Sequence, residues 1–366
     1  MVALTFMLTD ARTAVKHGQT LDPTSMPLAP PSRKSRAPAD SVRMEDVARA
    51  AGVSPITVSR ALNTPDKLSP QTLRAVRNAI ERLRYVPNLT AGSLASNRSR
   101  TVAVIVPTVN SSIFSDTIDG LSQALASRRY QLLLGQTNYS LEEEDALVHA
   151  FLGRRIDGLV LTGVNHARGV RSSILRAGIP VVETWDLSER PIHMLVGFSN
   201  HAAGHAAARY LLGKGHAPLS YIGGTDDRSV ARLQGFREAA REAGAGEVRS
   251  AALPVPASPA DAGRALADLL HSAAPRAVFC SNDMLAAGAL FECARRRIRV
   301  PQDLAIMGFA DLPIAASIEP PLTSMQVRAT EMGHRAAQML LGHLRGEPAA
   351  ERVVDLGFAV VERSST

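Results

Sequence analysis

Apolar residues between positions 42 and 63 recur with the spacing of an amphipathic α-helix in two short segments, MEDVARAA and PITVSRAL. The segments flank Ala51-Gly52-Val53-Ser54, in which Gly52 suits a turn that needs a positive φ. Ser54 followed by Pro55 is typical of a helix start, because the serine oxygen can accept free first-turn amides and proline needs no partner there. The pattern predicts a helix-turn-helix whose second helix begins at Pro55, with the inner positions Val47, Ala48, Ala51, Val58 and Leu62. A small helical hairpin without further role would give the same local pattern.

A third helix is predicted from Ser69-Pro70 to about Arg84 by the same combination of cap and proline. The stretch that follows, YVPNLTAGSLASNRS, predicts a short, weak helix of small residues with one large apolar side chain, Leu94. A compact helical head followed by a connecting segment is therefore expected before residue 101.

From Thr101 onward, short β-branched runs alternate with helical stretches. The predicted strands are TVAVIVP, YQLLLGQ, DGLVLTG, PVVETW, MLVGF, LSYIGG, AVFCS and LAIMGF. The predicted helices include DTIDGLSQALASR, LEEEDALVHAFLGR, HAAGHAAARYLLGKG, SVARLQGFREAAREAG, ADAGRALADLLHS and MLAAGALFECARRR. Such alternation predicts parallel sheets covered on both faces, and the number of units exceeds one open sheet. The predicted fold class is a small all-α head plus an α/β core of two doubly wound lobes, with any ligand at the carboxyl ends of the strands.

The charge of the chain is unevenly distributed. Of 366 residues, the first 100 contain 15 Lys and Arg against 7 Asp and Glu, whereas the remainder contains 26 against 27. A basic head on a neutral body favours a polyanionic partner such as nucleic acid, although a merely solubilising tail is an alternative.

Other features of composition indicate a cytoplasmic globular protein. The two cysteines, Cys280 and Cys293, form no CxxC pair, and no apolar run approaches the ~20 residues of a membrane span. Residues 1–41 lack a secretory pattern, so we expect a disordered leader, or a true start of translation near Val42.

The segments VARAAGVSPITVSRALN and YVPN...SLA resemble the DNA-binding head and hinge of the lac repressor family of bacterial transcription regulators, and the resemblance continues to the chain end. PVVETWD...VGFSNHAAG, CSNDMLAAGALFEC and DLGF most resemble the gluconate-utilisation repressors of that family. The resemblance implies a periplasmic-binding-protein-like core and a homodimer, since no heptad extension follows the last strand. It also implies a helix-turn-helix domain at 42–87, a hinge at 88–100 and a core at 101–366. Within the core, lobe 1 is expected at 101–198 and 329–355, and lobe 2 at 199–328 and 356–366.

In such a head the second helix enters the major groove of a near-palindromic operator. Arg60 resembles the guanine-contacting arginine of the family, whose fork matches the O6 and N7 acceptors. Pro55 and Ile56 can contact a thymine methyl but offer no hydrogen bond, so the operator sequence is not determined. Leu94 resembles the leucine that wedges into the central minor groove. The other expected DNA contacts are Ser54, Thr57, Ser59 and Asn63 in the head, and Asn88 and Ala91 in the hinge.

The resemblance places an effector in the core cleft, and the positions that match the family there are Arg232, Asn282, Asp283 and Phe309. The other candidates follow predicted first-lobe strands, namely Ser111, Ser112, Phe114, Glu183, Trp185 and Asp186, or lie at the crossing between the lobes, namely Arg328. Arg232 and Arg328 together could clamp a carboxylate, which favours a sugar acid over a neutral sugar. Ala310 stands where the family commonly has an acid. Asp283 could instead cap a helix, and Trp185 could be a partly buried surface residue.

These observations predict an allosteric transcriptional repressor of carbohydrate or sugar-acid genes, released from DNA by a gluconate-like inducer. The effector could instead be a neutral sugar, a nucleoside or a purine, and it could promote DNA binding as a corepressor. A periplasmic sugar-binding protein is a further alternative. The chain lacks the motifs of nucleotide-binding, hydrolase and metalloprotease enzymes, so no catalytic residue and no cofactor are expected. His201 and His205 have metal-ligand spacing on a predicted helix, but a solvated helix face is the simpler interpretation.

Overall fold

The computed structural model describes residues 42–86, 98–110, 112–272, 274–347 and 351–366. The chain divides into two compact units, Met1–Pro87 and Asn88–Thr366. We call the described residues 42–86 the head and the described residues from 98 onward the core. The expected leader, 1–41, lies outside the described residues, as do most of the expected hinge and its candidate contacts Asn88, Ala91 and Leu94.

The head contains α1 (Met44–Ala51), α2 (Pro55–Asn63), the short 3-10 helix η1 (Pro65–Lys67) and α3 (Pro70–Leu83). Its core is formed by the buried side chains Val47, Ala48, Val58, Val76, Ala79 and Tyr85. The predicted turn is confirmed, because Gly52 ends α1 with φ 68°. Ser54 Oγ accepts the amide of Thr57 at 3.2 Å, which confirms the predicted start of α2.

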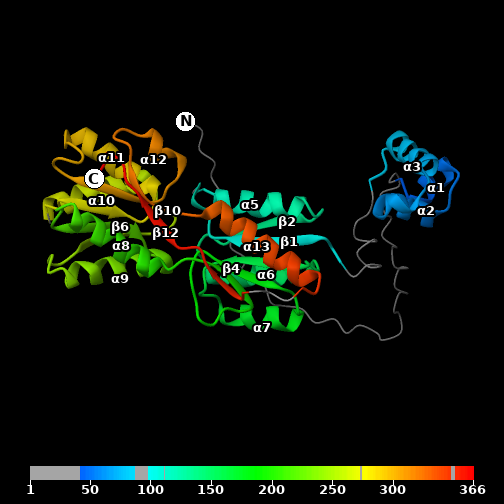
Figure 1. Ribbon diagram of the computed structural model, residues 1–366, viewed down its shortest axis with the longest axis horizontal. Coiled ribbons are helices and arrows are strands. Elements are labelled where there is room, and N and C mark those ends of the chain that lie inside the picture. Colours follow the sequence, from blue (N-terminus) through cyan, green and yellow to red (C-terminus); the bar gives the residue numbers. More distant parts are fainter. Residues whose placement is uncertain (1–41, 87–97, 111, 273, 348–350) are drawn as a thin grey trace, which may run out of the picture. The chain divides into compact units, whose positions relative to one another are not determined.

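The first lobe of the core is a six-stranded sheet in the order β11-β5-β4-β3-β1-β2, in which all neighbours are parallel. The strands are β1 (Thr101–Val106), β2 (Gln131–Gln136), β3 (Gly158–Thr162), β4 (Val181–Thr184), β5 (Met194–Gly197) and β11 (Val353–Asp355). Helices α5 (Ser115–Ala126), α6 (Leu141–Gly153), α7 (Arg168–Ala177) and α13 (Ala329–Leu344) cover its two faces, and η2 (Ser112–Phe114) precedes α5 (Figure 1).

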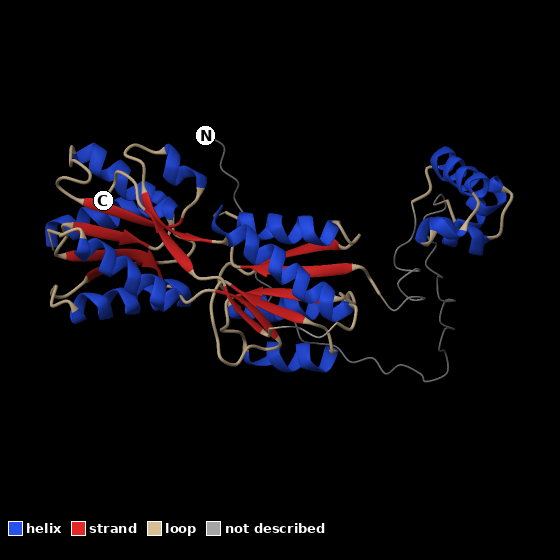
Figure 2. Ribbon diagram, in the orientation of Figure 1, coloured by secondary structure: helices blue, strands red, loops and turns tan. Residues whose placement is uncertain are grey.

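The second lobe is a six-stranded sheet in the order β12-β10-β9-β8-β6-β7. Its strands are β6 (Leu219–Gly224), β7 (Arg249–Leu253), β8 (Ala277–Cys280), β9 (Ala305–Ala310), β10 (Thr323–Val327) and β12 (Phe358–Val361). Its helices are α8 (Asn200–Gly213), α9 (Asp227–Glu242), α10 (Pro259–Ser272), α11 (Asp283–Arg296) and α12 (Pro313–Ser317). Figure 2 shows each sheet sandwiched between helices, as the apolar strands predict.

The structure departs from the predicted pattern at its edges. β12 pairs antiparallel with β10, so the second sheet is not entirely parallel. The edge strand β7 was not predicted, because RSAAL lacks a long apolar run. Among the described residues no helix is long and apolar enough to cross a membrane.

Candidate nucleic-acid interface and ligand cleft

Helix α2 presents an exposed surface next to its buried residue Val58. Ile56, at the start of this helix, is 66% exposed. Pro55 and Arg60 are also exposed, and Arg60 makes no side-chain hydrogen bond or ion pair within the described residues. An available guanidinium beside an apolar contact is suited to the edge of a base pair.

The polar candidates on α2 are partly engaged with the helix itself. Ser54 Oγ caps the helix, and Ser54 and Thr57 share a hydrogen bond of 3.0 Å between their hydroxyls. Asn63 Nδ2 donates to the carbonyl of Ser59 at 3.0 Å. These groups would have to share or exchange those bonds to contact phosphates.

A cleft opens at the carboxyl ends of the strands and is lined from both lobes. Four of the predicted effector residues contribute to it, namely Phe114, Trp185, Arg232 and Asn282. It is also lined by Thr108, Ile113, Tyr139, Gly224, Asp226, Arg228, Val255, Pro256, Ala257, Ser281 and Leu285. The cavity volume is about 50 Å³.

Arg232 lies at the base of this cleft and is 4% exposed. One terminal nitrogen donates to Asn200 Oδ1, the other donates to the carbonyl of Ser281 at 3.3 Å, and Nε has no partner among the described residues. The guanidinium carbon stands 4.1 Å from the ring centroid of Phe309. A buried, incompletely satisfied cation is a strong site for an anionic group.

Arg228 is a second arginine in the cleft, and it was not predicted. Its side chain is 11% exposed, approaches Asp226 at 3.5 Å and stands 5.6 Å from the ring centroid of Phe114. Its position in the first turn of α9, after the strand that ends at Gly224, was the available signal. Arg228 and Arg232 are one helical turn apart, so both guanidinium groups can face the cleft.

An aromatic wall forms the first-lobe side of the cleft. Trp185 is 2% exposed, so it is not a surface residue, and its Nε1 donates to Thr117 Oγ1 at 3.1 Å. The ring of Phe114 packs edge-on against it at a centroid distance of 5.1 Å. Asn200 Nδ2 donates to the carbonyl of Trp185 at 2.8 Å, which links this wall to Arg232.

Several predicted effector residues do not line the cleft. Arg328 is exposed, pairs with Glu331 at 3.6 Å and lies outside the lining, so the structure does not bring it together with Arg232. Asp186 Oδ1 accepts the amide of Leu187 at 2.9 Å. Ser112 is exposed outside the lining, Phe309 lies buried beneath Arg232, and Ser111 lies outside the described residues.

Asp283 is fully buried and serves neither as a lining residue nor as the cap of α11. Its carboxylate accepts the amide of Leu312 and the hydroxyl of Ser324, each at 2.6 Å. The cap is Asn282, whose Oδ1 accepts the amide of Leu285 at 2.9 Å. Burial raises the pKa of Asp283 to about 7. Asp283 therefore fixes the start of α11, and with it Asn282, against the second sheet.

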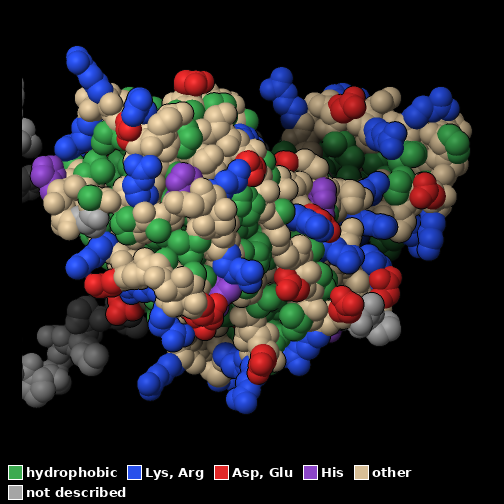
Figure 3. All heavy atoms as spheres, turned by 60° about the vertical axis from the view of Figure 1, so that its left-hand side comes forward, with side chains coloured by type: hydrophobic (Ala, Val, Ile, Leu, Met, Phe, Trp, Pro, Cys, Tyr) green, Lys and Arg blue, Asp and Glu red, His purple; other side chains and the backbone are tan. Residues whose placement is uncertain are grey.

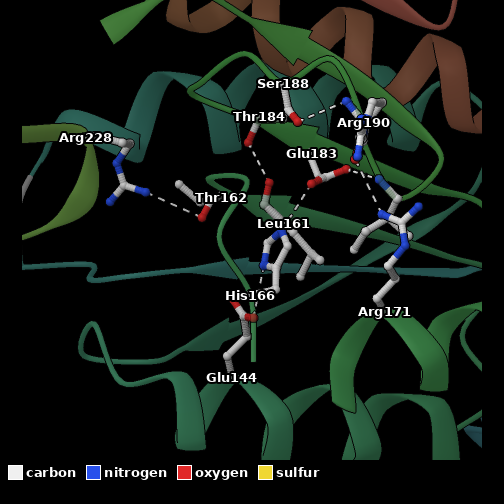
Figure 4. A network of polar contacts seen from close by, with 12 residues as sticks. Glu144, Leu161, Thr162, His166, Arg171, Glu183, Thr184, Ser188, Arg190 and Arg228 are labelled. Atoms are coloured by element: carbon white, nitrogen blue, oxygen red, sulfur yellow. Dashed lines mark hydrogen bonds and ion pairs between the residues drawn. The ribbon is translucent and has the colours of Figure 1, made fainter. Parts of the chain in front are cut away.

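Glu183 belongs to a buried polar network behind the cleft rather than to its lining (Figure 4). His166 contacts Glu144 through Nδ1 at 3.0 Å and Glu183 through Nε2 at 3.3 Å, and Glu183 also accepts the amide of Ile192. Burial alone would lower the pKa of His166, but the two carboxylates raise it to about 9. Contacts between the lobes lie beside His166. Asn165, in the same loop, donates to Asp227 at 2.8 Å, and Arg228 donates to the carbonyl of Thr162, the last residue of β3.

Because the pKa of His166 is raised above its unfolded value of about 6.5, protonated His166 stabilises the fold. Its contribution, roughly 2–4 kcal/mol, should be complete below pH ~6.5 and lost as pH rises through about 9. Urea unfolding of wild type and His166→Gln between pH 6 and 10 measures it, with the exposed His271→Gln as control. The difference between wild type and H166Q should shrink with rising pH. A difference that stays constant would contradict the assignment.

Within the described chain, no group of three His, Cys, Asp or Glu side chains could hold a metal ion. His201 and His205 instead pair with Glu238 and Glu242 at 2.9 and 3.0 Å.

Comparison with known proteins gives two family matches. Residues 43–88 match the lacI family of bacterial regulatory proteins, and residues 208–366 match a periplasmic binding protein-like domain. The HTH-type transcriptional regulator GntR of Pseudomonas aeruginosa is 38% identical over 327 residues, which cover 88% of this chain and 95% of that protein.

Solved structures are also similar to this chain. A lacI-family transcriptional regulator from Silicibacter pomeroyi matches with a TM-score of 0.81 and 30% identity, covering 88% of this chain and 99% of the other. The transcription regulator GntR from Chromobacterium violaceum matches with a TM-score of 0.70 and 35% identity, covering 72% of this chain and 98% of the other.

Proposed function

The chain belongs to the lacI family of bacterial regulatory proteins, and from that premise we propose that it represses sugar-acid catabolic genes until a gluconate-like acid enters its core cleft. Its relatives are transcriptional regulators, and it acts by binding DNA rather than by catalysis. We assign 42–87 to the DNA-binding domain, 88–100 to the hinge and 101–366 to the effector-binding and dimerisation core. The protein works in the cytoplasm as a homodimer on a near-palindromic operator.

Two adjacent arginines in the cleft carry the proposal of an acidic effector. Arg228 and Arg232 both line the cavity, whereas its only carboxylate, Asp226, is the N-cap of α9 and lies beside Arg228. Two guanidinium groups can together donate hydrogen bonds to the two oxygens of one carboxylate. A neutral sugar has no negative charge to pair with them. The aromatic wall of Phe114 and Trp185 suits the apolar face of a carbon chain. The resemblance of the sequence to gluconate-utilisation repressors supports the same class.

The mechanism is a population shift between two states of the dimer. The acid binds Arg232 and Arg228, which line the cleft between the lobes, and favours a different separation of the lobes. A change in the first lobes alters the spacing of the two hinges and lowers operator affinity. An acid that raised operator affinity instead would identify a corepressor.

Arg228→Gln should weaken binding of gluconate by about 10- to 100-fold, as expected for loss of one charge-assisted hydrogen bond of ~1.5–3 kcal/mol. Thermal unfolding measures this, because a ligand at 100 times its Kd stabilises the native state by ~2.7 kcal/mol. Gluconate and related acids should raise the wild-type midpoint and glucose should not. Arg237→Gln, an exposed arginine on the same helix, should behave as wild type.

A midpoint raised by a neutral sugar or a nucleoside, and by no sugar acid, would contradict the proposed effector class. It would leave DNA binding untouched. Selection from random duplexes tests the DNA-binding proposal separately, and should enrich a near-palindrome.

A further inference from the structure

The arginines of the first lobe are concentrated at one edge of its sheet. All neighbouring strands in this sheet are parallel, so the six segments that lead into them lie at the same edge. The described residues of these segments, 98–100, 127–130, 153–157, 175–180, 188–193, 343–347 and 351–352, contain ten arginines against four acidic residues. We call the ten the amino-edge arginines, and they are Arg98, Arg100, Arg128, Arg129, Arg154, Arg155, Arg176, Arg190, Arg345 and Arg352.

The excess is specific to this edge. The segments that follow the same six strands, 107–114, 137–140, 163–167, 185–187, 198–199 and 356–357, contain a single Asp or Glu, Asp186, and no Lys or Arg. In the second lobe, the segments that lead into the parallel strands, 214–218, 243–248, 273–276, 297–304 and 318–322, contain four Lys and Arg against three Asp and Glu. Figure 3 turns the left-hand side of Figure 1 toward the viewer, and shows basic and acidic side chains interspersed.

The positive charge at the amino edge is incompletely neutralised. Arg128, Arg129 and Arg155 are exposed and make no side-chain hydrogen bond or ion pair within the described residues. Of the acids, Asp157 is occupied by the backbone amides of Ser99 and Arg100 at 2.8 and 2.9 Å, and Glu347 is paired with Arg345.

Two of these arginines also line one surface groove. Arg128 and Arg345 border a groove of about 400 Å³ between α5 and α13, together with Gln123, Ala124, Ser127, His334, Gln338 and Leu341. The groove contains no acidic side chain among its lining residues. Such a surface is complementary to a polyanion.

The place at which the chain enters the core indicates that the polyanion is DNA. Asp157 fixes Ser99 and Arg100 at this edge, so the chain that comes from the head enters the core there. Eleven residues, 87–97, separate the two described parts, and eleven residues can span at most about 40 Å. Duplex DNA held by α2 can therefore come within reach of the amino edge. We propose that the amino-edge arginines contact phosphates of the DNA that flanks the operator, independently of its sequence. This proposal rests on the proposed DNA-binding function.

The experiment compares two triple variants. Arg128→Gln, Arg129→Gln and Arg155→Gln remove charge from the amino edge, and Arg209→Gln, Arg241→Gln and Arg297→Gln remove equal charge from exposed sites of the second lobe. Each protein is titrated at several salt concentrations with the selected operator, either trimmed or flanked by mixed sequence. Because the slope of log K against log salt changes by ~0.9 for each phosphate contact, the edge variant should lose a slope of about 2 or more on the flanked duplex.

On the trimmed operator, the edge variant should match wild type, and the second-lobe variant should match wild type on both duplexes. Arg→Lys at the three edge positions should keep the slope, since lysine retains the charge. Equal slopes for wild type and the edge variant, or an equal loss on both duplexes, would overturn the proposal. If wild type bound no operator selectively, the proposed function itself would fail, which is a distinguishable result.

Discussion

Arg60→Ala should lower operator affinity by about 30- to 10⁴-fold and remove the preference for one base pair in each half-site. The exposed guanidinium of Arg60 is available for a bidentate contact with guanine, which is worth ~1–3 kcal/mol against the wrong base. A dimer places one such contact in each half-site, so the loss is about 2–6 kcal/mol. Equilibrium titration of the selected operator measures the affinity, and repeated selection with the variant measures the preference.

The matched control is Arg77→Ala, which removes an exposed arginine from α3. It should change affinity little and leave the preferred sequence unchanged. If R60A weakened binding to all duplexes equally, Arg60 would contact phosphate rather than base, and the proposed orientation of α2 would be wrong.

Arg232→Gln should produce a repressor that binds operator but no longer responds to the acid. Truncating one partner of a buried, hydrogen-bonded charge pair costs ~2–5 kcal/mol, so effector affinity should fall by about 30-fold to several thousandfold. The thermal midpoint should also fall, because Asn200 and the carbonyl of Ser281 lose their donor. Operator titration with and without the acid measures the response.

Arg232→Lys keeps the positive charge but lacks the planar guanidinium. It should lose the response to the acid with a smaller loss of stability, and so separates these two effects. Arg328→Gln is the matched control, because Arg328 is exposed and outside the cleft. If R328Q lost the response to the acid while R232Q kept it, Arg328 rather than Arg232 would be the arginine that binds the effector.

The head was predictable almost residue by residue, because its signals are local. Ser54 with Pro55 and Ser69 with Pro70 begin helices where caps and prolines predict. The eight predicted strands of the core are also present, since long apolar runs identify buried parallel strands. β7 and β10 are not among those runs, because polar residues interrupt the short segments RSAAL and TSMQV.

The cleft was predictable only in part, because its members come together through tertiary packing. Arg232 and Asn282 follow strand ends and line the cavity. Glu183 also lies near the end of a strand, but its carboxylate contacts His166 from another loop, and sequence spacing does not reveal that contact. Arg228 was missed because a first-turn arginine of a helix is usually solvated.

The central claim is that α2 contacts DNA bases and that the core decides when it does so. Its most direct test is the affinity of the intact protein for the selected operator and for a scrambled duplex of equal length, with and without the acid that raises the thermal midpoint. We expect the operator to bind at least ~10³-fold more tightly than the scrambled duplex, and the acid to remove most of that difference. Equal affinity for both duplexes, or an operator affinity that no bound metabolite changes, would contradict the account.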